Sequence, residues 1–413
     1  MKFLASIVLL SSTVLAQSSA KPAITGTWVG SVAVKGQSVP IFLRIAGSPS
    51  ALTATLLNGS DGTPASSATF QDGHLQLNFS YFARSLDATL TNGNLTGTFG
   101  GKRKGFFPVT LHPAKLAKAP ALPKPDVLGD WEIAVNNSRG ESAWVLKIAK
   151  SYVPQETIRA VIQRIDGDTG ALYGVWSEDH FLVSHATAAG FELLTIKPLK
   201  DGTLAVTDLL DEKPAPLIAR RPADARKENL APPTDTAQQT TIKDPNALFP
   251  FSFPDLTGKT VSNTDPQFDG KVVIIAIGGS WCPNCHDEAP FLQSLYQKFH
   301  TRGLAIVNLS FEEEDQLKNP TRLRAFVQRY GLTYNVLLAG TTDQLNEKVT
   351  VANNLNCWPT SFFLGRDGRV KEIHAGYAGP ANPSANAALT HEVTELVEHL
   401  LAEPAPVRSA SLQ

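Results

Sequence analysis

The chain is poor in cysteine: among 413 residues there are three, Cys282, Cys285 and Cys357, all in the last third. An exported protein of this length could carry several structural disulfides, and this count excludes such a framework. Two of the three are separated by only two residues. This placement favours a chemical role for the cysteines over stapling of the fold.

Charge and long apolar runs are also scarce. Charged residues make up 18% of the chain and the formal net charge is −1, so nothing global favours nucleic acid or an anionic membrane surface as a partner. After the N-terminus, no segment offers the roughly 20 apolar residues that a membrane-spanning helix needs. The hydrophobic share of 42% is typical of a globular protein, and the length favours two or three domains.

The N-terminus has the pattern of an export signal. Lys2 precedes an apolar stretch that starts at Phe3, and residues 14–16 and 18–20 both fit the small-x-small cleavage pattern. We predict a signal peptide over residues 1–20 and a periplasmic or secreted protein. A permanent N-terminal membrane anchor is the alternative, which the shortness of the apolar stretch disfavours.

Residues 24–215 favour β structure, with short alternating runs and turns of the Asn-Gly or Asp-Gly type. A weak internal repeat runs through this region. Gly26-Thr27-Trp28 is echoed by Gly129-Asp130-Trp131, and later pairs keep an offset near 103 to 109. We predict two tandem meander modules, barrel- or sandwich-like, with one tryptophan plugging each core. The alternative is a ligand pocket inside them.

From about residue 247 the pattern changes to alternating strands and helices. Continuous apolar runs at 271–277 and 304–309 predict strands buried on both faces of a sheet. Helical spacing is present at 288–299, 321–330 and 387–401, and a hairpin is expected over 360–373.

Cys282 and Cys285 follow the first of these strands and open a helix. Unpaired N–H groups and positive dipole potential at a helix start stabilise a thiolate, so Cys282 is expected to attack and Cys285 to resolve the mixed disulfide. Pro283 suits the first helical turn. A zinc site is an alternative that lacks ligands, since only Cys357 remains. A static disulfide is another, although so tight a loop constrains little chain entropy.

Residues 247–401 resemble the TlpA/ResA group of extracytoplasmic thioredoxin-like oxidoreductases. The resemblance rests on Gly270-Lys271 before the strand and on the W-C-x-x-C-x-x-E-x-P pattern that runs from Trp281 to Pro290. It implies a thioredoxin-like fold, protein thiols or disulfides as substrates, an unidentified membrane or periplasmic electron donor, and no cofactor. It leans toward reduction, as in cytochrome c maturation or antioxidant repair of oxidised exported proteins.

The resemblance also implies roles for single residues. Pro359 would be a cis-proline facing the site, while Trp281 and the backbone of Trp358 would contact a bound substrate. Glu288 would tune the thiol pKa values and relay protons, although a carboxylate there could simply complement the helix dipole. Cys357 could be an extra redox thiol or a small buried hydrophobe. His286 is expected to be an exposed helix residue.

The prediction is thus a multidomain chain, two all-β meander modules followed by an α/β thioredoxin-like domain. Its expected parts are a signal peptide (1–20), β module 1 (24–112), β module 2 (127–212), a linker (213–246), a thioredoxin-like domain (247–402) and a disordered tail (403–413). Two other functions stay open. One is a peroxiredoxin, which would need a threonine where Gly279 stands. The other is a cell-envelope binding protein whose β modules hold the partner.

Overall fold

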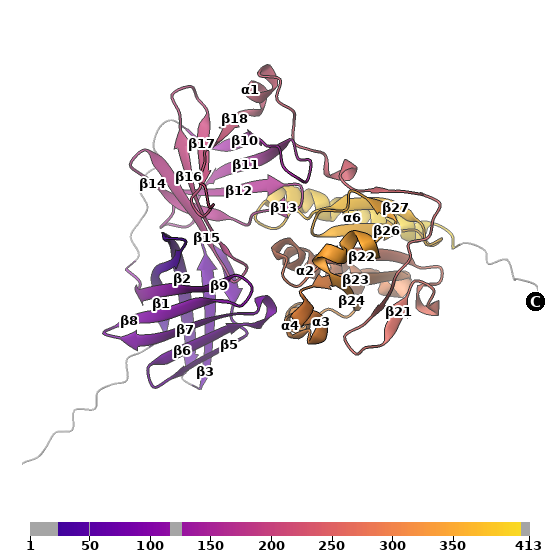
Figure 1. The fold of residues 1–413 in the computed structure, drawn as a ribbon, viewed down its shortest axis with the longest axis horizontal. Coiled ribbons are helices and arrows are strands. Elements are labelled where there is room, and N and C mark those ends of the chain that lie inside the picture. Colours follow the sequence, from indigo (N-terminus) through magenta and orange to yellow (C-terminus); the bar gives the residue numbers. More distant parts are fainter. Residues whose placement is uncertain (1–23, 49, 116–125, 406–413) are drawn as a thin grey trace, which may run out of the picture.

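The computed structural model describes residues 24–48, 50–115 and 126–405. The predicted signal peptide, most of the Pro-rich segment between the β modules, and residues 406–413 of the predicted tail lie outside the described residues. Two β modules and an α/β domain lie side by side, with helices α2 and α4 on the side of the α/β domain that faces the modules (Figure 1). The fold class predicted from the sequence is confirmed.

Module 1 is a single antiparallel sheet in the order β4-β3-β2-β1-β9-β8-β7-β6-β5, in which the first and last strands pair and β4 and β5 are the edges. Its inward side chains alternate along each strand; in β2, Val39, Ile41, Leu43 and Ile45 are buried. Its elements are β1 (Gly26–Val34), β2 (Gln37–Ser48), β3 (Ala51–Asn58), β4 (Asp61–Pro64), β5 (Ser67–Gln71), β6 (His74–Phe79), η1 (Ser80–Phe82), β7 (Arg84–Thr91), β8 (Asn94–Gly101) and β9 (Gly105–Pro113).

Module 2 has the same meander order, but its sheet closes into a barrel because β11 pairs with both β10 and β12. Its elements are β10 (Gly129–Ala134), β11 (Ala143–Lys150), β12 (Ile158–Arg164), β13 (Gly167–Asp168), β14 (Leu172–Ser177), β15 (His180–Ala186), β16 (Phe191–Pro198), β17 (Leu204–Asp208) and β18 (Leu217–Arg220).

The internal repeat is visible at atomic detail. Trp28 donates its indole N–H to the Ile24 carbonyl at 2.9 Å, and Trp131 donates to the Val127 carbonyl at 2.8 Å. Both indoles are buried in their module's core. Each tryptophan therefore plugs the core of its module in the same way, as the repeated sequence predicts.

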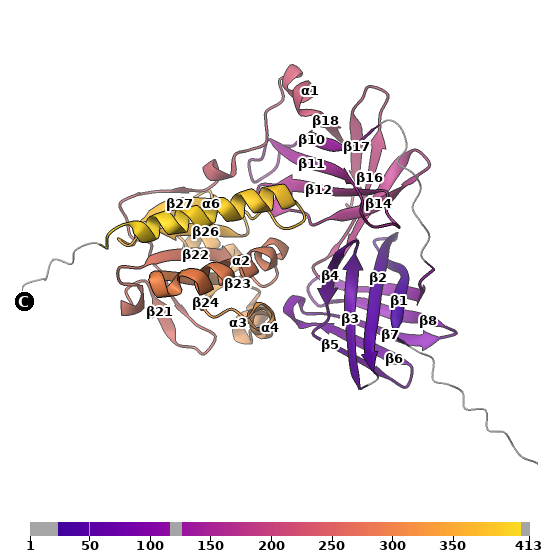
Figure 2. The same ribbon diagram turned by 180° about the vertical axis from the view of Figure 1, so that it is seen from behind.

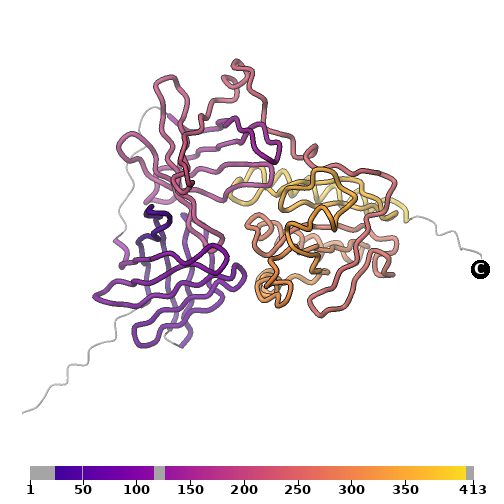
Figure 3. Tube along the Cα trace, in the orientation of Figure 1, coloured from indigo at the N-terminus to yellow at the C-terminus, as the bar shows by residue number. Residues whose placement is uncertain are grey.

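The segment expected to be a linker differs in one respect. β18 lies within residues 213–246, yet it pairs with β10 and β17 and so closes the barrel. Prolines on both sides of this four-residue strand hide it in the sequence. Beyond it come α1 (Pro222–Lys227), η2 (Thr236–Gln238) and β19 (Thr241–Ile242), and the trace in Figure 3 shows this stretch leading from module 2 to the α/β domain.

The α/β domain is a five-stranded sheet in the order β24-β23-β22-β26-β27, with β22 parallel to β23 and antiparallel to β26. Helices α2, α4 and α6 cover one face, as Figure 2 shows for α6 and α2. Residues Phe249 to Phe268 and α5 cover the other. This is the arrangement of a thioredoxin-like domain.

The elements of this domain fall close to the ranges expected from the sequence. They are β20 (Ser252–Pro254), β21 (Thr260–Ser262), η3 (Pro266–Phe268), β22 (Val272–Gly278), α2 (Pro283–Phe299), η4 (His300–Arg302), β23 (Leu304–Glu312), α3 (Glu314–Lys318), α4 (Thr321–Tyr330), β24 (Asn335–Thr341), η5 (Thr342–Gln344), α5 (Leu345–Lys348), β25 (Ala352–Asn353), β26 (Thr360–Leu364), β27 (Val370–Ala375) and α6 (Pro383–Ala402).

Candidate active site

The two paired cysteines lie where the buried central strand β22 ends and α2 begins. Cys282 is the N-cap residue of α2, Pro283 occupies the first turn, and Cys282 Sγ accepts a hydrogen bond from the Cys285 N–H at 3.2 Å. The two cysteines form a disulfide with their Cα atoms 5.3 Å apart. On reduction, the helix N–H groups and dipole that now face Cys282 Sγ would favour its thiolate over its thiol.

Trp281, the residue before Cys282, packs against a tryptophan that precedes a cis peptide bond. The Trp281 indole donates to the Phe311 carbonyl at 2.8 Å and packs edge-on against Trp358, with ring centroids 5.3 Å apart. The Trp358–Pro359 peptide bond is cis, and the Pro359 carbonyl accepts from the Gly376 N–H at 2.7 Å. The indole of Trp281 is therefore held in one orientation beside Cys282.

Glu288 lies one helical turn beyond Cys285 and is buried. Its Oε1 accepts from the Ser361 hydroxyl on β26 at 2.9 Å. Burial raises the pKa of its carboxyl to about 7, and the serine hydrogen bond opposes this only in part. A carboxyl that titrates near neutral pH beside a disulfide can take up or release a proton during exchange.

A buried ionic cluster fixes the strand end before the cysteines, and the sequence alone did not reveal it. The Glu312 carboxylate, fully buried on β23, accepts from the Ser280 N–H at 2.7 Å and from the Ser280 hydroxyl at 2.8 Å. Arg322 on α4 pairs with Glu312 at 2.6 Å and donates to the Ser280 hydroxyl. The helix α4 thereby anchors the backbone that leads into Trp281 and Cys282.

Module 2 contacts a residue that lies between the two cysteines. The Asp166 carbonyl, in the β12–β13 hairpin, accepts from the Asn284 side chain at 2.8 Å and from the Tyr377 N–H at 3.3 Å. Gly167 follows with φ +130°, and a Cβ there would lie 2.4 Å from the Tyr377 carbonyl oxygen. Cys282 is 2% exposed and Cys285 5%. The disulfide is therefore buried, and the hairpin is bound to Asn284, one of the two residues between its cysteines.

His286 is buried, which corrects the expectation of an exposed helix residue. Its Nε2–H donates to the Ser280 carbonyl (2.9 Å), so Nδ1 of the neutral ring accepts from the Tyr330 hydroxyl (3.0 Å). The ring stacks on Phe82 of module 1 with centroids 4.0 Å apart. Burial lowers its pKa to about 3. The ring is thus neutral at physiological pH and offers no positive charge to a thiolate. The covering phenylalanine lies about 200 positions earlier in the chain, so local sequence could not reveal it.

Cys357 is a free, fully buried thiol. It packs with Ile165 of module 2 and Ala375, and burial raises its pKa to about 12. Such a thiol stays protonated near neutral pH and is a poor nucleophile. Its surroundings match those of a small core residue at the contact between module 2 and the α/β domain.

A cavity of about 500 Å³ lies between the two modules and the start of α2. Pro283 and Asn284 contribute to its wall, together with the carboxyls of Asp168 and Asp287. Burial and the neighbouring acid Asp168 raise the pKa of Asp287 to about 7.

Among the residues that the structure describes, no group of three or more His, Cys, Asp or Glu side chains is placed to hold a metal ion. A search of the same residues finds no helix with the length and apolar character needed to cross a bilayer.

Comparison with known proteins places the likeness in the C-terminal part of the chain. Residues 246–373 match the model of the AhpC/TSA family. The thiol–disulfide oxidoreductase ResA of Bacillus thuringiensis (strain Al Hakam) is 31% identical over 122 residues, which are 30% of this chain and 64% of ResA. The thioredoxin-like protein YneN of Bacillus subtilis (strain 168) is 29% identical over 126 residues, 30% of this chain and 68% of YneN.

A crystal structure of a putative thiol:disulfide interchange protein DsbE from Chlorobium tepidum aligns with TM-score 0.31 and 21% identity, covering 39% of this chain and all of that one. The region matched to ResA spans less than two thirds of the length of ResA. Its C-terminal part is a thioredoxin-like domain, as the five-stranded sheet and the cysteine pair at the start of α2 define it. Within that class it is similar to ResA, and the resemblance drawn from the Trp281–Pro290 pattern is confirmed.

Proposed function

We propose that this protein is a thiol–disulfide oxidoreductase that exchanges electrons between its own cysteine pair and disulfides of other proteins outside the cytoplasm. The observation that carries the proposal is the Cys282–Cys285 disulfide at the N-terminus of α2, with Cys282 Sγ facing the helix N–H groups. The similarity to ResA supports the same class of reaction.

In the reducing direction the reaction starts from the dithiol. The Cys282 thiolate attacks one sulfur of a substrate disulfide, forms a mixed disulfide and expels the other sulfur as a thiolate, which takes up a proton. Cys285 then loses its proton and attacks Cys282 Sγ. The Cys282–Cys285 disulfide forms and the second substrate thiol leaves, so the substrate gains two electrons and two protons.

Glu288 is proposed to take part in these proton movements, with a pKa of about 7 that suits the task. Trp281, Trp358 and Pro359 are proposed to contact the substrate. A membrane or periplasmic electron donor then supplies two electrons and reduces the Cys282–Cys285 disulfide back to the dithiol. The export-signal pattern of residues 1–20 supports a periplasmic or secreted location.

A redox titration of the mature protein tests this proposal. The protein is equilibrated with dithiothreitol buffers of defined potential and then alkylated, and its thiols are counted by mass. We expect a reversible two-electron transition of Cys282 and Cys285, with a midpoint near or below about −230 mV for a reductase. A midpoint near about −150 mV would instead favour an oxidase or isomerase, and no transition would rule out the exchange reaction.

The AhpC/TSA match raises a thiol peroxidase as a second candidate. That chemistry would need a threonine hydroxyl at position 279. A Cβ on Gly279 would lie 2.3 Å from Trp281 Nε1 and 2.5 Å from the Phe311 carbonyl oxygen, so no larger residue fits while Trp281 keeps its place. Peroxide consumption by the reduced protein, compared with reduction of a protein disulfide, separates the two candidates. The third possibility, a binding protein, would keep its cellular role in a Cys282→Ser/Cys285→Ser variant.

A further inference from the structure

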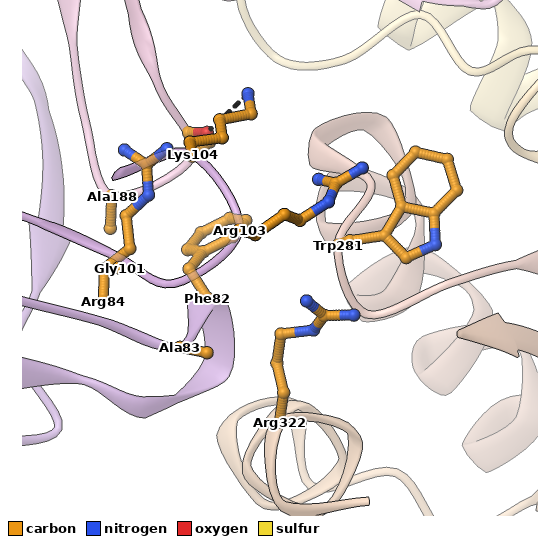
Figure 4. Close-up of a pocket in the computed structure, with 10 residues that line it drawn as sticks. Phe82, Ala83, Arg84, Gly101, Arg103, Lys104, Ala188, Trp281 and Arg322 are labelled. Atoms are coloured by element: carbon orange, nitrogen blue, oxygen red, sulfur yellow. Dashed lines mark hydrogen bonds between the residues drawn. The ribbon is translucent and has the colours of Figure 1, made fainter. Parts of the chain in front are cut away.

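A small cavity lies next to Trp281, between module 1 and the α/β domain (Figure 4). The loop between β8 and β9 and the start of β7 form one wall, while Trp281 and α4 form the other. Four basic side chains surround it: Arg84, Arg103, Lys104 and Arg322. The cavity measures about 20 Å³, which is room for a single small polar group.

Two of these basic groups are neutralised within the protein. Arg322 pairs with Glu312 and Glu313. Arg103 pairs with Glu313 at 2.6 Å, and its guanidinium lies 4.8 Å from the centre of the Trp281 ring. These contacts use both acids of the strand end and leave none for the other two cations.

Arg84 is the exception that points to a ligand. Arg84 is 8% exposed, and no acceptor among the described residues reaches its Nη1 atom. The nearest compensation is the Phe191 ring, whose centre lies 5.6 Å from Cζ. Burial and repulsion from Arg103 lower the pKa of Arg84 to about 10. A buried guanidinium without an acceptor is costly, so such a group is normally matched by an anion.

Lys104 adds charge to the same place. Within the part of the chain that the structure describes, its ammonium group reaches one acceptor, the Ala189 carbonyl at 3.5 Å. Burial together with repulsion from Arg84 and Arg103 lowers its pKa. Glu192 acts on Lys104 in the opposite sense, but burial raises the pKa of that acid to about 7, so it is only partly ionised near neutral pH. The cavity therefore keeps an excess of positive charge.

We propose that this cavity, called here the Arg84 subsite, binds a carboxylate carried by the disulfide substrate. The inference rests on the proposed exchange reaction. A planar carboxylate suits a guanidinium fork and a space of this size. Trp281 forms the wall and is joined directly to Cys282, so a carboxylate in the subsite would hold the substrate beside the attacking sulfur. A neighbouring cavity of about 760 Å³ shares Arg103 and Arg322 with the subsite and leaves space for the rest of the molecule.

The test compares three disulfides of similar length and different charge: 3,3′-dithiodipropionate (anionic), bis(2-hydroxyethyl) disulfide (neutral) and cystamine (cationic). The rate constant with which each disulfide oxidises the reduced full-length protein is measured. It is divided by the rate constant with which the same disulfide oxidises dithiothreitol. We expect a normalised preference of at least about tenfold for the anionic over the neutral disulfide, equivalent to about 1.4 kcal/mol. Arg84→Met should abolish this preference, so that the protein discriminates between the two disulfides no more than dithiothreitol does.

Lys104→Met and Lys150→Met form a matched pair, each removing one positive charge from a lysine. Lys150 ends β11, is exposed and lines neither the subsite nor the neighbouring cavity, whereas Lys102 lines that neighbouring cavity. We expect Lys104→Met to lower the anionic preference severalfold and Lys150→Met to leave it unchanged. Equal effects of the two variants, or no anionic preference in the unaltered protein, would overturn the proposal. This pair keeps the test decisive if Arg84→Met does not fold.

Binding without chemistry separates this proposal from the proposed function. Suberate has the length of dithiodipropionate and no sulfur, so its binding to the oxidised protein can be followed by calorimetry. We expect binding that Lys104→Met weakens and Lys150→Met does not. If no disulfide is reduced but suberate binds in this way, the exchange reaction fails and the subsite stands. If the neutral disulfide is reduced and suberate does not bind, the reverse holds.

Discussion

At the residue scale, the two cysteines differ in what they can do. Cys282 caps the helix with its sulfur facing backbone N–H groups, whereas Cys285 lies inside the first turn. The sequence pattern was enough to predict this asymmetry, because the strand before the pair and the helix after it are both encoded locally. The contact of Asn284 with Asp166 was not predictable, since Asp166 belongs to a module that lies far away in the sequence.

The asymmetry predicts different outcomes for two serine variants. Cys285→Ser should accumulate a mixed disulfide between Cys282 and a substrate, because no resolving thiol remains. Cys282→Ser should form none and should lose activity by on the order of 10³-fold or more, as expected for loss of a nucleophile. Non-reducing electrophoresis with mass spectrometry checks both. A stable adduct on Cys285 of the Cys282→Ser variant would contradict the assignment.

Glu288 gives a prediction about stability and pH. Its pKa is raised from 4.5 to about 7 in the folded protein, so the folded state holds this proton more tightly than the unfolded state. The contribution is complete below about pH 4.5 and is lost as the pH rises through about 7. Relative to the unaltered protein, Glu288→Gln should therefore become more stable between pH 5 and pH 8, by on the order of 1–3 kcal/mol.

Urea unfolding of the oxidised proteins at several pH values measures this difference. The comparison between the two proteins cancels the titration of His286, whose lowered pKa acts in the opposite sense below about pH 6.5. A difference in unfolding free energy that stays constant from pH 5 to 8 would mean that Glu288 does not titrate there.

At the scale of elements, α4 is more than an insertion between strands. The amphipathic spacing of Thr321–Tyr330 was sufficient to predict the helix with its observed bounds. Its function in the fold was not predictable, because Arg322 is a charged residue that turns inward to Glu312 and Ser280. Periodicity shows which face of a helix is apolar, but not which buried carboxylate a single arginine will meet.

This contact predicts the effect of removing Arg322. Arg322→Leu leaves the Glu312 carboxylate buried without its cation and should lower the free energy of unfolding by about 3–5 kcal/mol. Adding Glu312→Gln should restore part of the loss, because the uncompensated charge is then gone. Urea unfolding of the two single variants and the double variant completes the cycle. Additive losses in the double variant would show that the two side chains are not coupled.

β18 marks the corresponding limit for strands. Four residues between prolines carry too little pattern to be recognised, yet the barrel of module 2 needs them to join β10 to β17. Closure of a barrel is a property of the whole sheet. Local periodicity therefore does not predict the short strands that complete it.

At the scale of the whole molecule, both modules contact the cysteine pair region from outside the α/β domain. Asp166 binds Asn284 across 118 positions of sequence, and Arg103 lies over Trp281. The composition of each module gave no sign of this, since contacts between domains depend on how finished folds fit together.

The contact of Asn284 with the β12–β13 hairpin predicts a change in access. Asn284→Ala removes one hydrogen bond, worth about 1 kcal/mol, and should speed alkylation of reduced Cys282 by a bulky maleimide roughly fivefold. Alkylation by small iodoacetamide should change less. Asn353→Ala, which removes an asparagine that bonds to Thr241 at 3.4 Å, is the control. Equal acceleration with both reagents would indicate altered thiol reactivity instead of altered access.

The enclosure of the disulfide has a consequence for the flow of electrons. On the proposed function, the reduced cysteine pair would work in an oxidising compartment, where an exposed pair could be oxidised by unrelated disulfides. Because the pair is buried, its reaction with another protein would require the interface between module 2 and the α/β domain, which includes the hydrogen bonds of Asp166, to open. The choice of partner would then depend on which proteins can open this interface. The reduction potential would decide only the direction of electron transfer after opening.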